Sequence, residues 1–290
     1  MINLKITDMR AVPGDSAFLI DDGKTSILYD SGFGFTGDKI AENIKAQLGD
    51  RKLDYIFLTH SHYDHALASA YVLDFYPEAK VVAGSYATKI FAKPTARAVM
   101  MDLDRKFATK CGVENYRDLS ENLKVDIPVE HNDIITCGDM KFRAIALPGH
   151  TRCSIGFYLE ENRLLLANET LGVYFGDGQY LSSYLVGYQM TLDSFNEAKE
   201  LAIDSVLIAH YGLIENDEAK CFLENSEKNA VETAEKVLKM LRSGLSKEEI
   251  VQKYTDEIYD EKVSIIYPID AFKLNTEIMV DLLKREFLAE

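Results

Sequence analysis

Three of the six histidines of this 290-residue chain lie within six residues, in the segment His60-Ser-His62-Tyr-Asp64-His65. The segment directly follows the apolar run 55–58, which has the character of a short buried strand. Neutral imidazole is the usual protein ligand of zinc and related metals, and a carboxylate supplies the negative charge that a dication needs. The cluster therefore predicts a metal site at a strand end, in preference to a polar turn that happens to be rich in histidine.

The spacing within this cluster predicts that its side chains serve two ions. Side chains alternate between the two sides of an extended segment, so His60 and His62 should point the same way and can share one ion. Asp64 and His65 follow where the chain should turn into a helix over 66–75, so they can point towards a second ion. Asp64 is also a candidate N-cap of that helix.

Other candidate ligands occur later in the chain, each just after an apolar run. These are His150, Glu169 and His210. In layered α/β folds, active-site loops sit at the ends of strands, so these residues are expected to join the first cluster. The remaining histidine, His131, lies in a polar stretch and is expected to be an exposed loop residue.

Up to about residue 214, the chain alternates between short apolar strands and helices. Strands are expected at 17–20, 26–29, 55–58, 81–83, 134–136, 141–147, 154–159, 163–167 and 205–208, and helices at 37–47, 66–75 and 86–111. Strands interleaved with helices favour an α/β layered fold.

The pattern changes at about residue 215, where apolar residues take on helical spacing. We expect one domain over 1–214 and an α-helical C-terminal extension over 215–290 that covers the site. Helices are expected over 218–242 and 271–287, and a further one starts at Ser246, which opens a capping box.

Composition excludes several classes of function. The chain has 32 Lys and Arg against 47 Asp and Glu, a net charge of −15, which opposes binding to nucleic acid because phosphates require a basic surface. No stretch approaches the length of a membrane span, and the N-terminus carries charges where a signal peptide needs an apolar core. The four cysteines form no C-x-x-C pair. We expect a cytoplasmic protein with reduced thiols.

The order of the candidate ligands resembles that of the metallo-β-lactamase superfamily. The resemblance covers residues 16–212 and rests on the following residues in sequence order: Asp30, His60, His62, Asp64, His65, His150 in a Pro-Gly-His-Thr segment, an acidic residue after an apolar strand, and His210. Asp30 resembles the aspartate that orients the metal loop of that superfamily from outside the ligand set.

This resemblance implies an αββα four-layer sandwich with two metal ions at one edge of its sheets. The implied ligands are His60, His62 and His150 for the first ion and Asp64, His65 and His210 for the second, with a carboxylate between them. Zinc is the first expectation for both ions, and iron and manganese are alternatives because such ligand sets accept all three.

The chain departs from the superfamily pattern at Glu169, where most members have Asp. Glutamate is one methylene longer, which displaces the carboxylate by roughly 1–1.5 Å. Glu169 could bridge two ions, bind one of them, support the ligands from outside, or only cap its loop beside Asn168. Cys153 follows the Pro-Gly-His segment and is either a further ligand or a small buried side chain.

The resemblance and the ligand types together predict a metal-dependent hydrolase of a small ester, thioester, lactone or phosphoester. A metal-activated hydroxide would attack the substrate, and Asp64 would both bind metal and hold the nucleophile. The alternatives are an iron-dependent oxidoreductase or dioxygenase of the same fold, and a non-catalytic sensor that kept the metal.

The sequence says less about the partner molecule. The aromatic stretch 172–188 follows Glu169, so Tyr174 and Phe175, together with Tyr211, are weak candidates for contacts to a small-molecule substrate. The same stretch could instead form the surface of a homodimer or local core. The basic segment 89–110 could meet an anionic substrate, or it could be a solvated helix face.

Overall fold

The structure is a computed structural model of the whole chain, and it describes residues 1–288. Two six-stranded sheets form its centre. The first sheet contains, in spatial order, β1 (Lys5–Asp8), β2 (Phe18–Asp21), β3 (Ser26–Tyr29), β4 (Tyr55–Leu58), β5 (Lys80–Gly84) and β6 (Ile127–Val129). The second contains β14 (Gly212–Glu215), β13 (Ser205–Ile208), β10 (Leu164–Leu166), β9 (Ile155–Leu159), β8 (Met140–Ala146) and β7 (Ile134–Cys137).

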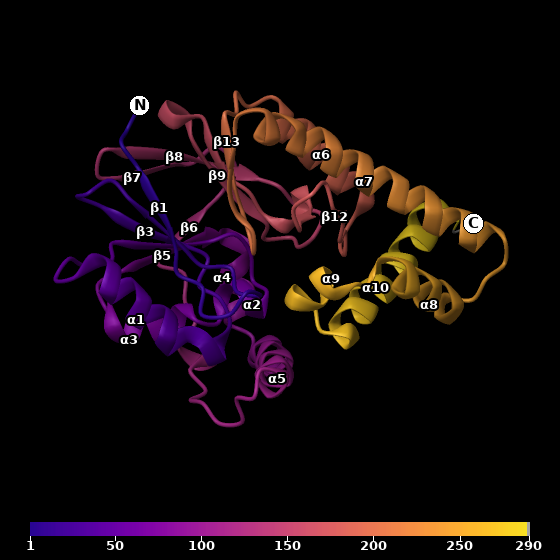
Figure 1. Cartoon of the computed structure of the whole chain (residues 1–290), viewed down its shortest axis with the longest axis horizontal. Helices are drawn as coiled ribbons and strands as arrows, with labels where there is room; N and C mark the ends of the chain where they lie inside the picture. Colours follow the sequence, from indigo (N-terminus) through magenta and orange to yellow (C-terminus); the bar gives the residue numbers. More distant parts are fainter. Residues whose placement is uncertain (289–290) are drawn as a thin grey trace.

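The helices cover both outer faces of this sandwich. They are α1 (Gly37–Leu48), α2 (Tyr63–Ala66), α3 (Ser69–Phe75), α4 (Ser85–Phe91), α5 (Pro94–Lys110), α6 (Tyr188–Lys199), α7 (Asn216–Arg242), α8 (Lys247–Ile258), α9 (Glu261–Ile266) and α10 (Ile269–Phe287). Figure 1 shows α1 and α3 outside the first sheet, and α6 and α7 outside the second. A short hairpin of β11 (Val173–Tyr174) and β12 (Tyr180–Leu181) lies beside α7.

Alternating side chains along each strand divide the interior into three hydrophobic layers. In β4, Phe57 packs between the two sheets, whereas Ile56 and Leu58 face the helices of the first sheet. In β10, Leu166 packs between the sheets and Leu165 faces the other way, towards the helices of the second sheet. Because strand side chains alternate with a period of two, each sheet separates two cores. The predicted αββα sandwich is confirmed.

Several elements differ from the sequence prediction. The expected helix 66–75 is two short helices, α2 and α3, and its predicted cap is wrong because His62 is the N-cap of α2 and Asp64 lies in the first turn. The segment 86–111 is also two helices, and Pro94 starts the second, where its missing N–H costs nothing. Apolar periodicity missed the strands β1, β6 and β14 and the helices α6 and α9.

The C-terminal helices share a core with the sandwich. One continuous cluster contains Leu165 of β10 and Phe195 of α6, and also Phe222, Tyr254 and Leu283 of α7, α8 and α10. Figure 1 shows α9 and α10 at the end of the sandwich next to α2. The expected capping box at Ser246 is present, with Glu249 as its partner. The division at residue 214 remains a prediction.

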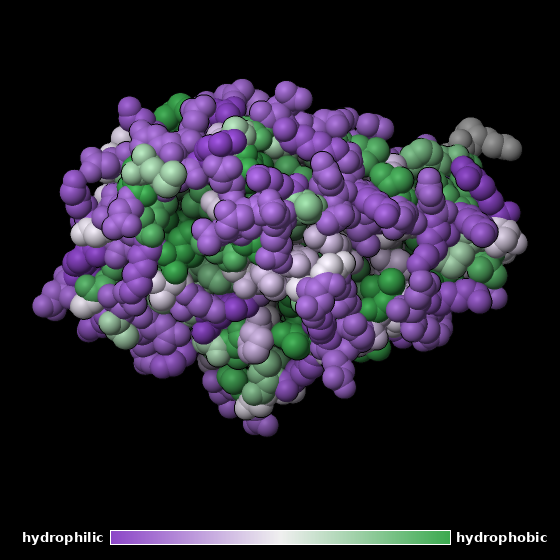
Figure 2. Space-filling view, turned by 45° about the horizontal axis from the view of Figure 1, so that its top comes forward, coloured by the Kyte–Doolittle hydropathy of each residue, from purple (hydrophilic) through white to green (hydrophobic). Residues whose placement is uncertain are grey.

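The surface is mostly hydrophilic on the face that Figure 2 shows, with hydrophobic residues in small groups. Among residues 1–288, no helix combines the length and the apolar character that crossing a bilayer requires.

Candidate metal centre

The predicted ligands lie on loops that leave the strands at one end of the sandwich. The cluster 60–65 follows β4 of the first sheet. His150, Glu169 and His210 follow β8, β10 and β13 of the second sheet, and Glu169 begins a short 3-10 helix. Both sheets therefore contribute candidate ligands to the same small region. The packing of one sheet on the other keeps these side chains close together.

Four of these residues form a first group. His60, His62, His150 and Glu169 each place one potential ligand atom within 4.8 Å of the others. The Nε2 atom of His150 is 2.9 Å from Nδ1 of His62. This group contains His60 and His62, as their alternation along an extended segment predicted.

The second group consists of Asp64, His65 and His210, whose ligand atoms also lie within 4.8 Å of one another. The Nε2 atoms of His65 and His210 are 3.2 Å apart. Oδ2 of Asp64 is 3.7 Å from each of these two nitrogens. All three side chains are buried.

Glu169 lies between the two groups. One of its oxygens, Oε2, is 2.8 Å from Nε2 of His150 and 3.7 Å from Nε2 of His65. The other oxygen, Oε1, is 3.4 Å from Nε2 of His210. The interpretation of Glu169 as a loop cap is wrong, because Asn168 caps the 3-10 helix by accepting from Thr170 N–H.

Hydrogen bonds on the outer side of the imidazoles orient them. Nδ1 of His150 donates to the carbonyl oxygen of Ser183 over 2.6 Å, and Nδ1 of His210 donates to that of Gly14 over 2.9 Å. Nδ1 of His65 donates to Oδ2 of Asp30 over 2.8 Å. Because Nδ1 donates outwards in each ring, the Nε2 atom faces the site, which is the arrangement that metal-binding histidines need.

Asp30 belongs to neither ligand group, but it contacts His65 of the second group directly and reaches His60 of the first group through Thr59. It accepts from the backbone N–H and the hydroxyl of Thr59 and from the hydroxyl of Ser16. The hydroxyl of Thr59 also lies 3.0 Å from Nδ1 of His60. Asp30 has a φ angle of 51°, and His210 has one of 64°, both in the left-handed region that non-glycine residues seldom adopt.

Burial and neighbouring charges shift the pKa values of the site. Burial and the charge of neighbouring histidines hold the pKa values of His60 and His62 well below 6.5, so both rings are neutral at pH 7. Burial alone would raise the pKa of Glu169, but the adjacent charge of His150 and the hydrogen bonds from the histidines hold it well below its usual value. Burial opposes the charged form of His65, but the charges of Asp64 and Asp30 raise its pKa well above 6.5, so this ring has to release a proton when a dication binds.

The residues fit a pair of divalent metal ions. Nε2 of His60 is buried and has no hydrogen-bond partner among residues 1–288, although such atoms are normally satisfied. Nitrogen atoms of His62 and His150 lie 2.9 Å apart, and those of His65 and His210 lie 3.2 Å apart. An ion shared between the facing atoms would satisfy all of them.

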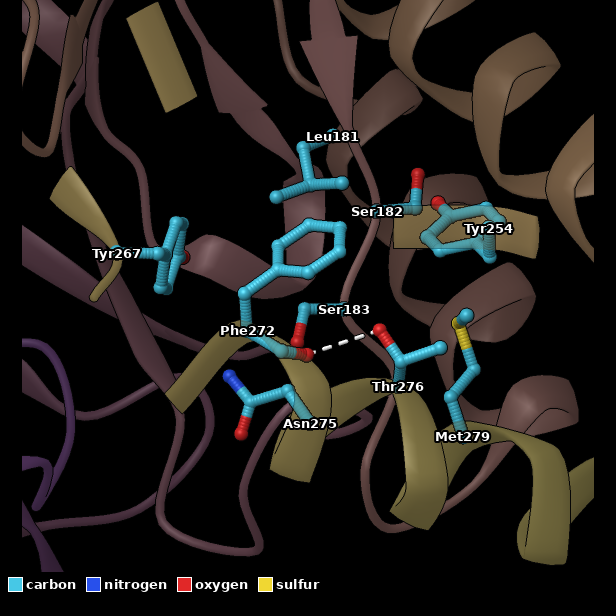
Figure 3. Close-up of a pocket in the computed structure, with 9 residues that line it drawn as sticks. All are labelled: Leu181, Ser182, Ser183, Tyr254, Tyr267, Phe272, Asn275, Thr276 and Met279. Carbon is cyan, nitrogen blue, oxygen red and sulfur yellow. Dashed lines mark hydrogen bonds between the residues drawn. The ribbon is translucent and has the colours of Figure 1, made fainter. Parts of the chain in front are cut away.

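Sequence reasoning missed Tyr267, which lies between α9 and α10. Its hydroxyl donates a 2.5 Å hydrogen bond to Oε1 of Glu169. Burial and the charge of Glu169 raise the pKa of Tyr267 well above its usual value, so the phenol stays protonated. Figure 3 shows Tyr267 beside Phe272 and Asn275 of α10, which face Ser183. A lone tyrosine in a helical segment carries no local signal of this contact.

A cavity of about 60 Å³ borders the ligands. It is lined by His62, Tyr63, Asp64, Leu103, Glu169, Tyr267, Ala271, Leu274 and Asn275. The cavity therefore lies between the candidate ligands and residues at and before the start of α10.

The weak substrate candidates lie elsewhere. The rings of Tyr174 and Tyr211 pack in a tilted arrangement, with centroids 4.7 Å apart, and the hydroxyl of Tyr174 donates to Glu218 of α7. Phe175 packs against the same core. None of the three lines the cavity that borders the ligands. Cys153 is a small buried side chain outside both ligand groups, and its thiol lies 3.3 Å from the hydroxyl of Ser61.

Comparison with known proteins agrees with this geometry. The family model of the metallo-beta-lactamase superfamily matches residues 12–210. The metallo-beta-lactamase fold-containing protein ST1585 of Sulfurisphaera tokodaii is 27% identical over 167 residues, which are 56% of this chain and 62% of that protein. The solved structure of ST1585 has 22% identity and a TM-score of 0.61, and the alignment covers 98% of this chain and 99% of that one.

Two further relatives belong to different classes of protein. Glyoxylase B2 of Dictyostelium discoideum is 27% identical over 142 residues, which are 48% of this chain and 44% of that protein. The flavo-diiron protein FprA2 of Clostridium acetobutylicum is 25% identical over 205 residues, 68% of this chain and 45% of that protein. The matches thus cover less than two thirds of each relative. With a family model that matches residues 12–210, the chain belongs to the metallo-β-lactamase superfamily.

Proposed function

We propose that this protein is a metal-dependent hydrolase of a small ester, thioester, lactone or phosphoester. The observation that carries the proposal is the convergence of seven buried or half-buried metal-ligating side chains from both sheets beside a small cavity. The superfamily contains hydrolases, and the match to Glyoxylase B2 supports this class.

In this proposal, His60, His62 and His150 would hold one ion, Asp64, His65 and His210 would hold the other, and Glu169 would supply negative charge beside them. Divalent ions held there would lower the pKa of a bound water towards 7 and polarise the substrate carbonyl or phosphoryl oxygen. Zinc is the first candidate, and iron and manganese suit the same ligands.

The protein's own residues prepare the reaction. Asp64 lines the cavity, so the carboxylate oxygen that does not bind metal can accept a proton from the attacking water and hold that water towards the substrate. Tyr267 donates to Oε1 of Glu169 and fixes the longer carboxylate in one position. The walls of Leu103, Ala271 and Leu274 exclude bulk water from one side of the cavity.

The test combines metal analysis with a substrate panel. The purified protein is analysed for bound metal and assayed with 4-nitrophenyl carboxylic esters, thioesters, lactones and phosphoesters. We expect about two ions per chain and turnover of at least one substrate class. His62→Ala should lose metal and turnover together, whereas His131→Ala, which changes an exposed histidine outside the ligand groups, should keep both. Full activity of His62→Ala would contradict the proposal.

The second candidate is an iron-dependent oxidoreductase, which the match to the flavo-diiron protein favours. Bound iron would give the protein colour, and the protein would consume oxygen or a related oxidant with a reductant present. Bound metal without turnover in either assay would instead support the non-catalytic sensor.

A further inference from the structure

A second cavity lies beside the one that borders the ligands. It has a volume of about 350 Å³ and lies between α2, α5 and the start of α10. Tyr63, Leu103, Ala271 and Leu274 line both cavities, so the two are adjacent. We call the two adjacent cavities together the access pocket.

The walls of the access pocket are mainly apolar. Its outer part is lined by Leu103, Pro268, Ile269, Ala271 and Leu274, together with the rings of Tyr63 and Tyr259. Ile269 and Leu274 are 44% and 45% exposed, so this apolar wall is accessible from outside the protein. The outer volume alone reaches the range of about 300–1,000 Å³ that is typical of small-molecule sites.

Positive charge gathers at the outer part of the pocket. Lys106 and Lys110, one turn apart on α5, are both in its lining. Nζ of Lys110 donates to the carbonyl oxygen of Ser264 over 2.9 Å, which holds this ammonium across the gap between α5 and α9. The inner end carries Asp64 and Glu169, whose charges the ions of the proposed function would offset. The lysines therefore offer an anion a separate site at the outer end of the pocket.

Two carboxylates also lie near these lysines. Asp270 lines the outer cavity, and Asp102 pairs with Lys106 over 2.7 Å. The Lys106–Asp102 pair is exposed, with side chains 61% and 64% accessible, so it contributes little free energy and can exchange for another anion. Each ammonium group has three donors, and the contacts above use only some of them.

We propose that the access pocket binds an amphiphilic substrate with a hydrolysable group at the metal end, an apolar chain in the middle and an anionic group at the lysine end. This inference rests on the proposed function and names its substrate class as an ester or thioester of a medium-length chain that ends in a carboxylate or similar anion. Water adds across the acyl–oxygen or acyl–sulfur bond and yields an acid and an alcohol or thiol.

Calorimetric titration tests the binding without any turnover. The zinc-loaded protein is titrated with octanoate, with the uncharged octanamide and with the shorter butyrate. Octanoate should bind at one site per chain, octanamide roughly fivefold or more weakly because it lacks the charge, and butyrate at least about tenfold more weakly because it buries fewer methylenes.

Substitutions inside and outside the access pocket test whether octanoate binds there. Lys106→Gln with Lys110→Gln should weaken octanoate roughly fivefold, and Leu274→Asp, at a half-exposed position that tolerates a charge, should weaken it further. The control is Lys93→Gln, an exposed lysine at the N-terminus of α5 outside the pocket, which should bind octanoate as the unaltered protein does.

The outcomes separate the two proposals. If the lysine variants bind octanoate unchanged, the carboxylate sits elsewhere, for example on the metals, and the substrate proposal is wrong. The protein could instead dimerise in a concentration-dependent way and show no saturable octanoate binding. That result would assign the apolar wall to a second copy of the chain, and the substrate proposal would be wrong. Octanoate binding that depends on the lysines, in a protein without hydrolase activity, would instead overturn only the proposed function.

Discussion

Asp30 and Tyr267 are side chains outside the proposed ligand set that hold members of it in place. Asp30 accepts four hydrogen bonds, from Ser16, from the backbone and side chain of Thr59, and from His65. Tyr267 donates to Glu169. An imidazole or carboxylate that is fixed before the metal arrives loses less rotational freedom on binding, which raises affinity.

Replacement of Asp30 by Asn should weaken metal binding about 10–100-fold. The amide would turn a donor towards groups that themselves donate, so the ring of His65 would lose its fixed orientation. Competition with a coloured chelator measures the affinity. Asp139→Asn, at an exposed aspartate that pairs only with Lys24, is the control and should bind metal normally.

Tyr267→Phe should lower the free energy of unfolding by about 1–3 kcal/mol, because Glu169 would lose a donor in a buried position. Urea denaturation of the metal-loaded protein measures this change. Tyr211→Phe removes the same hydroxyl from a residue that is 37% exposed and should change stability by less than about 0.5 kcal/mol. Equal effects of both substitutions would show that the bond to Glu169 contributes nothing.

At the scale of elements, α5 connects the first sheet to the C-terminal helices. Its Asp104 accepts from the backbone N–H groups of Gly34 and Phe35, over 2.8 and 3.1 Å, and from the hydroxyl of Tyr116. Lys110, near the C-terminal end of the same helix, donates to the carbonyl oxygen of Ser264 in α9. Helix α5 therefore holds the loop after β3 in place and also forms one wall of the outer part of the access pocket.

Burial raises the pKa of Asp104 from 3.8 to about 7, so the stability of the α5 contact should depend on pH. Between these values the folded state binds more protons than the unfolded state, and stability falls as pH rises, by at most roughly 1.4 kcal/mol per pH unit. Asn is neutral throughout, so the difference in unfolding free energy between the parent and Asp104→Asn should shrink from pH 5 to pH 8. A constant difference in denaturant titrations at the two pH values would show that Asp104 stays charged.

At the scale of the whole molecule, the candidate metal centre joins the two sheets. His60, His62, Asp64 and His65 come from the loop after β4, whereas His150, Glu169 and His210 come from the second sheet. Ions held between them would cross-link the two halves of the sandwich. The C-terminal helices close the same end, since Tyr267 contacts Glu169 and α10 lines the cavity.

Removal of the metal should therefore destabilise the entire fold. A ligand that binds only the folded state stabilises it by about 2.7 kcal/mol when present at 100 times its Kd. Calorimetry should show a lower Tm after chelation, and re-addition of zinc should restore it. In His62→Ala the shift should be smaller because one ligand is missing. An unchanged Tm after complete metal removal would mean that the sandwich needs no cross-link.

The sequence by itself determined the ligand types, their order and the division of the first cluster between two groups. Local geometry suffices for this, because alternation along an extended segment places His60 and His62 together, and the turn into α2 redirects Asp64 and His65. The layered fold was also predictable, since strands such as 55–58 and helices such as 37–47 have clear apolar patterns.

Only the tertiary structure decided what faces these ligands. The position of Glu169 between both groups, the bond from Tyr267 and the arrival of Lys106 and Lys110 at the outer pocket all join residues far apart in the chain. Contacts of this kind depend on how the two sheets and α10 pack, and packing follows from the summed burial of many apolar side chains. No short segment of sequence contains that information.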